Sequence, residues 1–181
     1  MKLVEFVRIM LRYYPKPSEC LHSPFHPRYR EGRTSVIESG HTVLIGWNDR
    51  SLGFIEQISI ARQDYGGGII CVLVEKTSED IERKFLSQTT KRDMKGTRVI
   101  FRTGEPQSLA CLKLVGIATA RSVVLMSSGD DPRVADANTL RILIALRVAG
   151  LQPDSYIVAE GTREMNILTF FSCCKSVSPN V

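Results

Sequence analysis

Long apolar runs are missing from this sequence. No stretch approaches the about 18 consecutive apolar residues that identify a membrane-spanning helix. The first residues, MKLVEFVRIMLRYY, also lack the pattern of a signal peptide, because Glu5 and Arg8 interrupt the apolar segment. The sequence therefore predicts neither a membrane-spanning helix nor a secretory leader.

Groups that could catalyse a reaction are also few. The chain has three histidines, His22, His26 and His41, and it contains no GxSxG, HExxH or GxxxxGK[ST] motif. Because no base stands beside a nucleophile in these patterns, hydrolase chemistry has no support. We expect a protein that is not an enzyme.

The five cysteines form no CxxC pair. Cys71 and Cys111 lie in apolar segments, where a thiol acts as a small hydrophobic side chain, and this use indicates a reducing compartment. Cys20, His22 and His26 lie within seven residues of one another, but no fourth zinc ligand is evident. Solvated polar residues are therefore favoured over a structural zinc site.

The composition is that of one globular domain: 181 residues, 43% of them hydrophobic and 24% charged. The net charge of +5 is concentrated in residues 1–34, where seven basic and three acidic side chains give 7 − 3 = +4. A basic arm can follow nucleic acid or anionic lipid. Because these charges are scattered, we favour a solvated linker beside a membrane and expect no nucleic-acid partner.

Four regions are predicted along the chain. Residues 1–14 have apolar residues at helical spacing and predict a short amphipathic helix, which could contact a membrane, a partner or the domain itself. Residues 15–34 hold four prolines and predict an irregular linker. Residues 35–172 are assigned to the main domain, and residues 173–181 to a disordered tail.

Short apolar runs alternate with helical segments from His41 onward, which is the pattern of a parallel sheet with crossover helices. Strands are predicted at 41–46, 69–74, 98–102, 122–126 and 155–159. Helices are predicted at about 51–64, 78–90, 105–114 and 133–148, with another from about 162. The predicted class is α/β, a Rossmann-like doubly wound parallel sheet of about five strands, incomplete at the C-terminus because no sixth strand follows.

Two details of these helices are also predicted. Pro106 is placed at the first position of the third helix, where its missing N–H costs little. Four apolar residues at helical spacing are placed on one face of the first helix: Leu52, Ile55, Ile58 and Ala61.

Ligands of an open parallel sheet bind outside the carboxyl ends of its strands. Five predicted loops therefore meet at one edge: 46–53, 75–78, 102–106, 127–132 and 160–162. The candidate ligand-binding residues lie in the first three of these loops: Gly46, Trp47, Asn48, Asp49, Gly53, Glu75, Arg102 and Gly104.

The first loop, GWNDRSLG, differs from a dinucleotide-binding loop. In the latter, glycines let backbone N–H groups approach the pyrophosphate, and an acid after the second strand binds the ribose. Glu75 has the place of that acid, but six residues separate the two glycines, and Trp47 and Asn48 put bulk where a phosphate would lie. NAD is therefore not an expected cofactor. In the alternative, structural interpretation, Trp47 covers the sheet edge and Asn48 or Asp49 caps the next helix.

Three carboxylates, Asp130, Asp131 and Asp136, lie near the start of the helix at 133–148. Ca²⁺ prefers several oxygen ligands, and Asp49 and Glu75 could add to them if the loops converge. Capping of the helix by Asp130 or Asp131 is favoured, because a carboxylate also suits the helix dipole. The two roles are compatible, so Ca²⁺ stays open and no cofactor is certain.

Several longer motifs resemble the cytosolic domain of Castor/Pollux ion channels. The stretch REGRTSVIESGHTVLIGW, residues 30–47, is similar to the start of that domain, where a basic stretch with glycine precedes Val-Ile-Glu and His-Thr-Leu-Ile-Leu-Gly-Trp. The similarity continues through residues 66–69 and Glu75. It is densest in MKGTRVIFRTGEP, residues 94–106, and returns in residues 120–124 and 136–141. It covers about residues 28–160.

The family's domain is similar to RCK domains, the regulators of K⁺ conductance. The resemblance implies Rossmann-like lobes that assemble as a gating ring beneath a tetrameric cation pore, with Ca²⁺ as a regulator. It also implies that Gly-Trp-x-Asp is the family's own form of the first loop, used without a dinucleotide. The implied function is gating of cation transport, with self-association or channel subunits as partners, at the nuclear envelope or another endomembrane.

Family members carry a pore before this domain and a longer RCK domain after it, whereas this sequence shows neither. It therefore resembles the N-terminal lobe of one gating domain, as a fragment, a truncated gene model or a free regulatory subunit. The alternative is a soluble Rossmann-type protein that binds a nucleotide or NAD(P).

Overall fold

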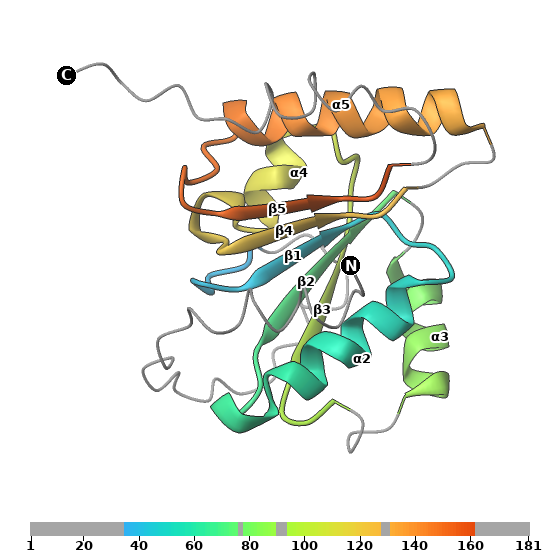
Figure 1. Cartoon of the computed structure of the whole chain (residues 1–181), viewed down its shortest axis with the longest axis vertical. Coiled ribbons are helices and arrows are strands. Elements are labelled where there is room, and N and C mark those ends of the chain that lie inside the picture. The colour runs from blue at the N-terminus through green and yellow to red at the C-terminus, as the bar shows by residue number, and fades with distance from the viewer. Residues whose placement is uncertain (1–34, 76–77, 90–93, 128–130, 162–181) are drawn as a thin grey trace.

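The structure, a computed structural model, describes residues 35–75, 78–89, 94–127 and 131–161. Strands and helices alternate along this part of the chain (Figure 1). In order they are β1 (Thr42–Ile45), α2 (Ser51–Ala61), η2 (Gln63–Tyr65), β2 (Ile69–Val74), α3 (Ser78–Gln88), β3 (Arg98–Thr103), α4 (Leu109–Leu114), η3 (Ile117–Thr119), β4 (Ser122–Leu125), α5 (Pro132–Val148) and β5 (Tyr156–Ala159). The helices predicted at 1–14 and from 162, the linker, the tail and the cluster of Cys20, His22 and His26 lie outside the described residues.

The strands form one parallel sheet in the order β3-β2-β1-β4-β5. β1 lies in the centre, and its Thr42 is aligned with Ile70 of β2 and Ser122 of β4. The chain first builds the sheet outward from β1 to β3 and then returns to add β4 and β5 on the other side. The predicted α/β class and doubly wound arrangement are confirmed.

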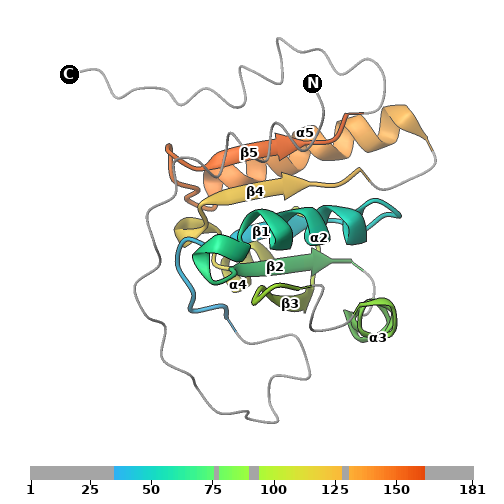
Figure 2. The ribbon, with the colours of Figure 1, turned by 60° about the horizontal axis from the view of Figure 1, so that its bottom comes forward.

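Helices cover both faces of the sheet, with α2 and α3 on one face and α4 and α5 on the other (Figures 1 and 2). The strands supply both cores because successive side chains of a strand point to opposite faces. In β1, Val43 and Ile45 pack under α4 and α5, whereas Leu44 packs under α2. The continuous apolar run of β1 is thus the sequence of a strand that is buried on both sides.

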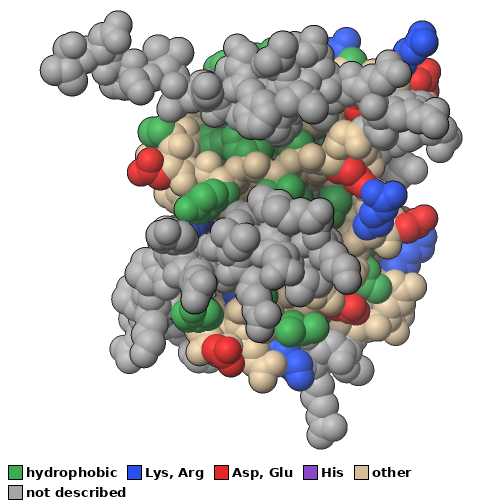
Figure 3. Space-filling model, viewed as in Figure 1, with side chains coloured by type: hydrophobic (Ala, Val, Ile, Leu, Met, Phe, Trp, Pro, Cys, Tyr) green, Lys and Arg blue, Asp and Glu red, His purple; other side chains and the backbone are tan. Residues whose placement is uncertain are grey.

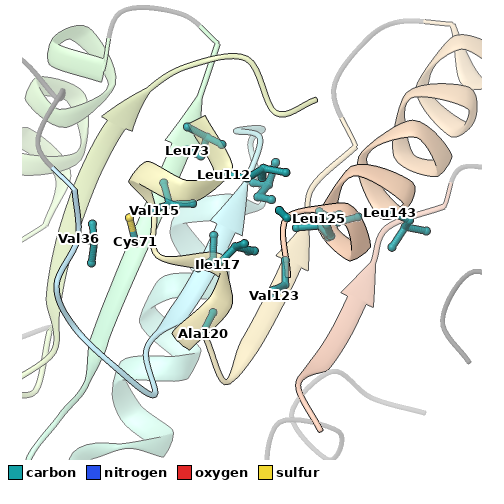
Figure 4. Close-up of a cluster of buried hydrophobic side chains, with 14 residues drawn as sticks. Val36, Cys71, Leu73, Leu112, Val115, Ile117, Ala120, Val123, Leu125 and Leu143 are labelled. Carbon is teal, nitrogen blue, oxygen red and sulfur yellow. The ribbon is translucent and has the colours of Figure 1, made fainter. Parts of the chain in front are cut away.

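The core beneath α4 and α5 is formed by residues of the sheet and of the helices on that face (Figure 4). Leu112 and Val115 of the α4 region and Leu143 of α5 meet Val123 and Leu125 of β4, and all five side chains are at most 2% exposed. This packing fixes the positions of the strand ends, which carry the candidate site.

The predicted face of α2 is largely confirmed: Ile55 and Ile58 are buried, Leu52 packs half-buried against the same core, and Ala61 is half-buried at the margin. Phe54, outside the predicted set, is buried beside them. The predicted start of α4 is wrong. α4 begins only at Leu109, because the N–H of Ser108 bonds to the carbonyl of Glu105 and closes a turn that contains Pro106.

No helix within the described residues is long and apolar enough to span a lipid bilayer.

Candidate binding site at the carboxyl edge of the sheet

The ends of β1 and β4 lie side by side where the strand order reverses, and we call this place the switch point. Gly46 continues β1 there, and its N–H donates to the carbonyl of Leu73 (2.9 Å), while the N–H of Met126 donates to the carbonyl of Ile45 (2.8 Å). The topology therefore brings the loops that follow β1, β4 and β5 together, as ligand sites of such sheets require.

Gly46 is needed at the switch point for a structural reason. Its φ of +89° is in the left-handed region, and a Cβ atom there would lie 2.6 Å from the carbonyl oxygen of Met126. Gly53 differs, since a Cβ atom there would meet nothing within 4 Å. Gly46 thus lets β1 and β4 approach each other, whereas the space beside Gly53 would accept a larger side chain.

Asn48 connects three of the loops. Its Nδ2 donates to the carbonyl of Ser127 (3.0 Å) and to Oε2 of Glu160 (2.8 Å). Its Oδ1 accepts from the N–H of Arg50 (3.0 Å), and its own N–H donates to the Ser51 hydroxyl (2.9 Å). The loop after β1 is thereby joined to the ends of β4 and β5.

The predicted cap of α2 takes another form. The N-cap residue of the helix is Arg50, and it makes no side-chain cap hydrogen bond. Asn48 bonds to the N–H two residues ahead, which closes a turn before the helix, and Asp49 is exposed beside it. The prediction that Asn48 or Asp49 caps the helix is therefore wrong, although Asn48 shapes the chain that enters it.

Glu160 is the acceptor at the centre of this network. Oε2 accepts from Asn48 Nδ2 and from the N–H of Ser127 (3.1 Å), and Oε1 pairs with the Arg50 guanidinium. The Glu160 side chain is 21% exposed and that of Arg50 is 79% exposed. Acidic and basic side chains lie beside one another on the side of the molecule where the strands end (Figure 3). The donors at the switch point therefore hold a carboxylate of the chain itself.

Trp47 turns away from this polar network. Its ring packs on Phe101 of β3, with centroids 5.8 Å apart at 58°, and Phe101 packs in turn on Phe85 of α3. Trp47 is half-buried against the core beneath α2. This is the structural role that the sequence indicated for it, and it fills space over the sheet edge.

The other candidate residues lie nearer the β3 side of the edge. Glu75 follows β2 and is exposed. Arg102 is buried and donates to the carbonyl of Phe101 (2.8 Å), and a Cβ atom on Gly104 would lie 2.6 Å from the sulfur of Cys111. Because β3 and β5 are opposite edge strands, Arg102 and Gly104 are not brought to Glu160.

The three predicted calcium ligands do not form one group in the part of the chain that the structure describes. Asp131 is the N-cap of α5, where its carboxylate accepts from the N–H of Arg133 (2.9 Å), and Asp136 is half-buried in the helix. Asp130 lies outside the described residues. Among the residues that the structure describes, no group of three His, Cys, Asp or Glu side chains could hold a metal ion. The capping role is confirmed, and Ca²⁺ binding stays a prediction.

Two buried ionisable groups are structural. Burial raises the pKa of the Cys71 thiol to about 12, against the opposing effect of nearby Arg102, so this thiol is a poor nucleophile. Burial also lowers the pKa of His41, although its hydrogen bond to the carbonyl of Val115 (2.8 Å) acts in the opposite direction. His41 joins the start of β1 to the chain after α4.

Four members of the switch-point network were not among the candidates from sequence: Arg50, Ser51, Ser127 and Glu160. The topology placed the loops that contain them at this edge. Only the structure shows that Asn48 and Glu160, 112 residues apart in sequence, are hydrogen-bonded.

The chain has clear relatives among plant ion channels. It is 38% identical over 117 residues to the probable ion channel CASTOR of Oryza sativa subsp. japonica, 36% to the ion channel DMI1 of Medicago truncatula and 35% to the probable ion channel POLLUX of Arabidopsis thaliana. Each match covers 65% of this chain but only 13% to 14% of the channel. No protein-family model matches the chain.

Solved structures with the same fold include an RCK domain. The crystal structure of the GsuK RCK domain superposes with a TM-score of 0.56 at 16% identity, over 87% of this chain and 29% of that one. The GsuK channel bound to NAD gives a TM-score of 0.55 at 16% identity, over 98% of this chain and 25% of that one. The chain is therefore homologous to the CASTOR, POLLUX and DMI1 ion channels, and its Rossmann-like sheet has the fold of an RCK domain.

Proposed function

We propose that this chain is a gating lobe, or part of one, that regulates a cation channel. The observation that carries the proposal is the homology to plant ion channels over 117 residues, combined with the fold of an RCK domain. We also propose that it has no enzymatic activity, since the polar groups at the switch point bond to one another and Cys71 is buried.

The surface of α5 supports assembly with other subunits. Val134, Ile144 and Val148 are 55%, 56% and 66% exposed, and at 100° per residue they share the side of the helix opposite Leu143 and Leu146, which are buried. An exposed apolar face on a helix indicates contact with a partner surface. We assign that face to self-association or to channel subunits in a gating ring.

Sedimentation velocity of the full chain tests this assignment. We expect oligomers that grow with concentration in the wild type and are lost in an Ile144→Asp/Val148→Asp variant. Ile60 of α2, 53% exposed on the other side of the sheet, gives the matched control, and Ile60→Asp should assemble like the wild type. A wild type that stays monomeric at high concentration, or equal effects of both variants, would contradict the role of α5.

An antibody raised against residues 41–160 tests the link to a channel in native cells. After fractionation, a membrane-bound band much heavier than the 20.3 kDa of this chain would support a channel subunit. A soluble band near 20.3 kDa would instead favour a free Rossmann-type protein.

A nucleotide-binding protein is the second candidate function. Exposed Glu75 at the end of β2 has the place of a ribose-binding acid, and one structural relative is a channel bound to NAD. Titration calorimetry with NAD would favour this function if binding were tight and lost in Glu75→Ala. Glu79→Ala, which removes an exposed acid from the nearby α3, is the control and should leave the binding unchanged.

A further inference from the structure

Three hydrogen-bond donors converge on one carboxylate at the switch point. The Asn48 amide and the N–H of Ser127 both point to Oε2 of Glu160, and the Arg50 guanidinium pairs with Oε1. We call these three donors the anion cradle. They come from loops after β1 and β4, whereas Glu160 follows β5.

The anion cradle has the chemistry of a phosphoryl site. An amide N–H, a backbone N–H and a guanidinium all donate to phosphate oxygens as they do to a carboxylate, and arginine pairs with either anion. Its place at the switch point is where open α/β sheets bind their ligands. Arg50 is 79% exposed, so one side of the cradle is open to solvent.

We propose that Glu160 is an internal ligand of this cradle, which binds a phosphoryl group only when the Glu160 carboxylate leaves. A tethered carboxylate competes at an effective concentration of about a millimolar or more, so a free anion of similar intrinsic affinity must exceed that level to displace it. The backbone of Glu160 is itself fixed, since its N–H donates to the carbonyl of Leu125 (2.9 Å). Exchange therefore requires rotation of the side chain and leaves β5 in place.

The end of β5 is thereby linked to the occupancy of the switch point. While Glu160 bonds to Asn48, Ser127 and Arg50, the loops after β1 and β4 are joined to the last described strand. A bound phosphoryl group would break that connection. This inference does not depend on the proposed gating function.

Titration calorimetry of the full chain with inorganic phosphate tests the proposal. Glu160→Ala should bind phosphate at least tenfold more tightly than the wild type, because the competing carboxylate is gone. An Asn48→Ala/Glu160→Ala variant should lose most of this gain. Adenosine monophosphate provides the second arm, since binding tighter than that of phosphate would show that the site takes the phosphate of a nucleotide.

Glu38→Ala is the matched control. Glu38 also forms an ion pair with an arginine, Arg98, and its side chain is 25% exposed against 21% for Glu160, but it precedes β1 at the other end of the sheet. The Glu38→Ala variant should bind phosphate no better than the wild type. Equal phosphate affinities of the wild type and Glu160→Ala would overturn the proposal, as would a gain that survives loss of Asn48. If Glu160→Ala does not fold, Glu160→Gln keeps the acceptor oxygen but frees Arg50, and no gain there would overturn the proposal equally.

Discussion

Replacement of Gly46 by alanine should destabilise the domain by about 2–5 kcal/mol. An L-residue in the left-handed region, where Gly46 has a φ of +89°, costs about 1–2 kcal/mol. The new methyl group would also lie 2.6 Å from the carbonyl oxygen of Met126, well inside the 3.4 Å at which ordinary contact begins. Relief of such overpacking costs about 1–3 kcal/mol more. The sum is a large part of the about 5–15 kcal/mol that stabilises an ordinary domain.

Urea unfolding of the full chain, followed by circular dichroism, measures this loss. Gly53→Ala provides a control of opposite sign, because Gly53 is exposed within α2 and a Cβ atom there meets nothing within 4 Å. Alanine is the better helix former, so this variant should gain about 0.5–1 kcal/mol.

Comparison of these two variants distinguishes a structural role of Gly46 from a ligand-binding one. If Gly46 were kept for a bound phosphate, Gly46→Ala would unfold like the wild type and lose only ligand affinity. A loss below about 1 kcal/mol in Gly46→Ala would refute our account of the β1–β4 approach.

Three further predictions concern His41, Asp131 and the loop that holds Asp130. The pKa of His41 is lowered in the folded domain, so as the pH falls below about 6.5 the unfolded chain binds a proton before the folded domain does. The free energy of unfolding should therefore decrease by up to about 1.4 kcal/mol for each unit by which the pH is lowered. Urea midpoints at pH 7.5 and 5.5 should show this loss in the wild type and much less of it in His41→Gln, and equal losses would contradict it. Asp131→Ala should cost about 1 kcal/mol of stability by removing the cap of α5, whereas Asp131→Asn, which keeps a capping oxygen, should cost less. In calorimetry with Ca²⁺, an identical heat signature for the wild type and Asp130→Asn/Asp131→Asn would remove that loop as a calcium site.

The sheet could be predicted from sequence because its strands are short apolar runs with strong local signals. The sequence predicts β2 at residues 69–74, where the structure has it, because glycines precede a run of β-branched and apolar residues. The predicted start of α5 at about residue 133 is one residue from the observed start at Pro132, because Asp131 and Pro132 are typical of a cap and a first helical residue. Such features depend on neighbours in sequence.

The remaining features depend on tertiary contacts. Pro106 has the same local signal as Pro132, yet it lies in a turn before α4, and no neighbouring residue distinguishes the two cases. The role of Gly46 depends on the carbonyl of Met126, 80 residues later, and that of Asn48 on Glu160. The sequence could therefore indicate which loops form the site but not which side chains meet there.

The central position of β1 has a consequence for how the domain folds. Thr42 pairs with Ile70 after 28 residues (70 − 42) but with Ser122 only after 80 (122 − 42). Closure of the longer segment costs about 0.9 kcal/mol more in chain entropy, so the pairing of β1 with β2 should precede its pairing with β4. β1 is also the one strand that joins both halves of the sheet in the described order, and without it β3-β2 and β4-β5 would be two separate pairs. During synthesis, the part of the sheet made of β1, β2 and β3 can therefore form on the ribosome first. One edge of β1 then stays unpaired until β4 emerges.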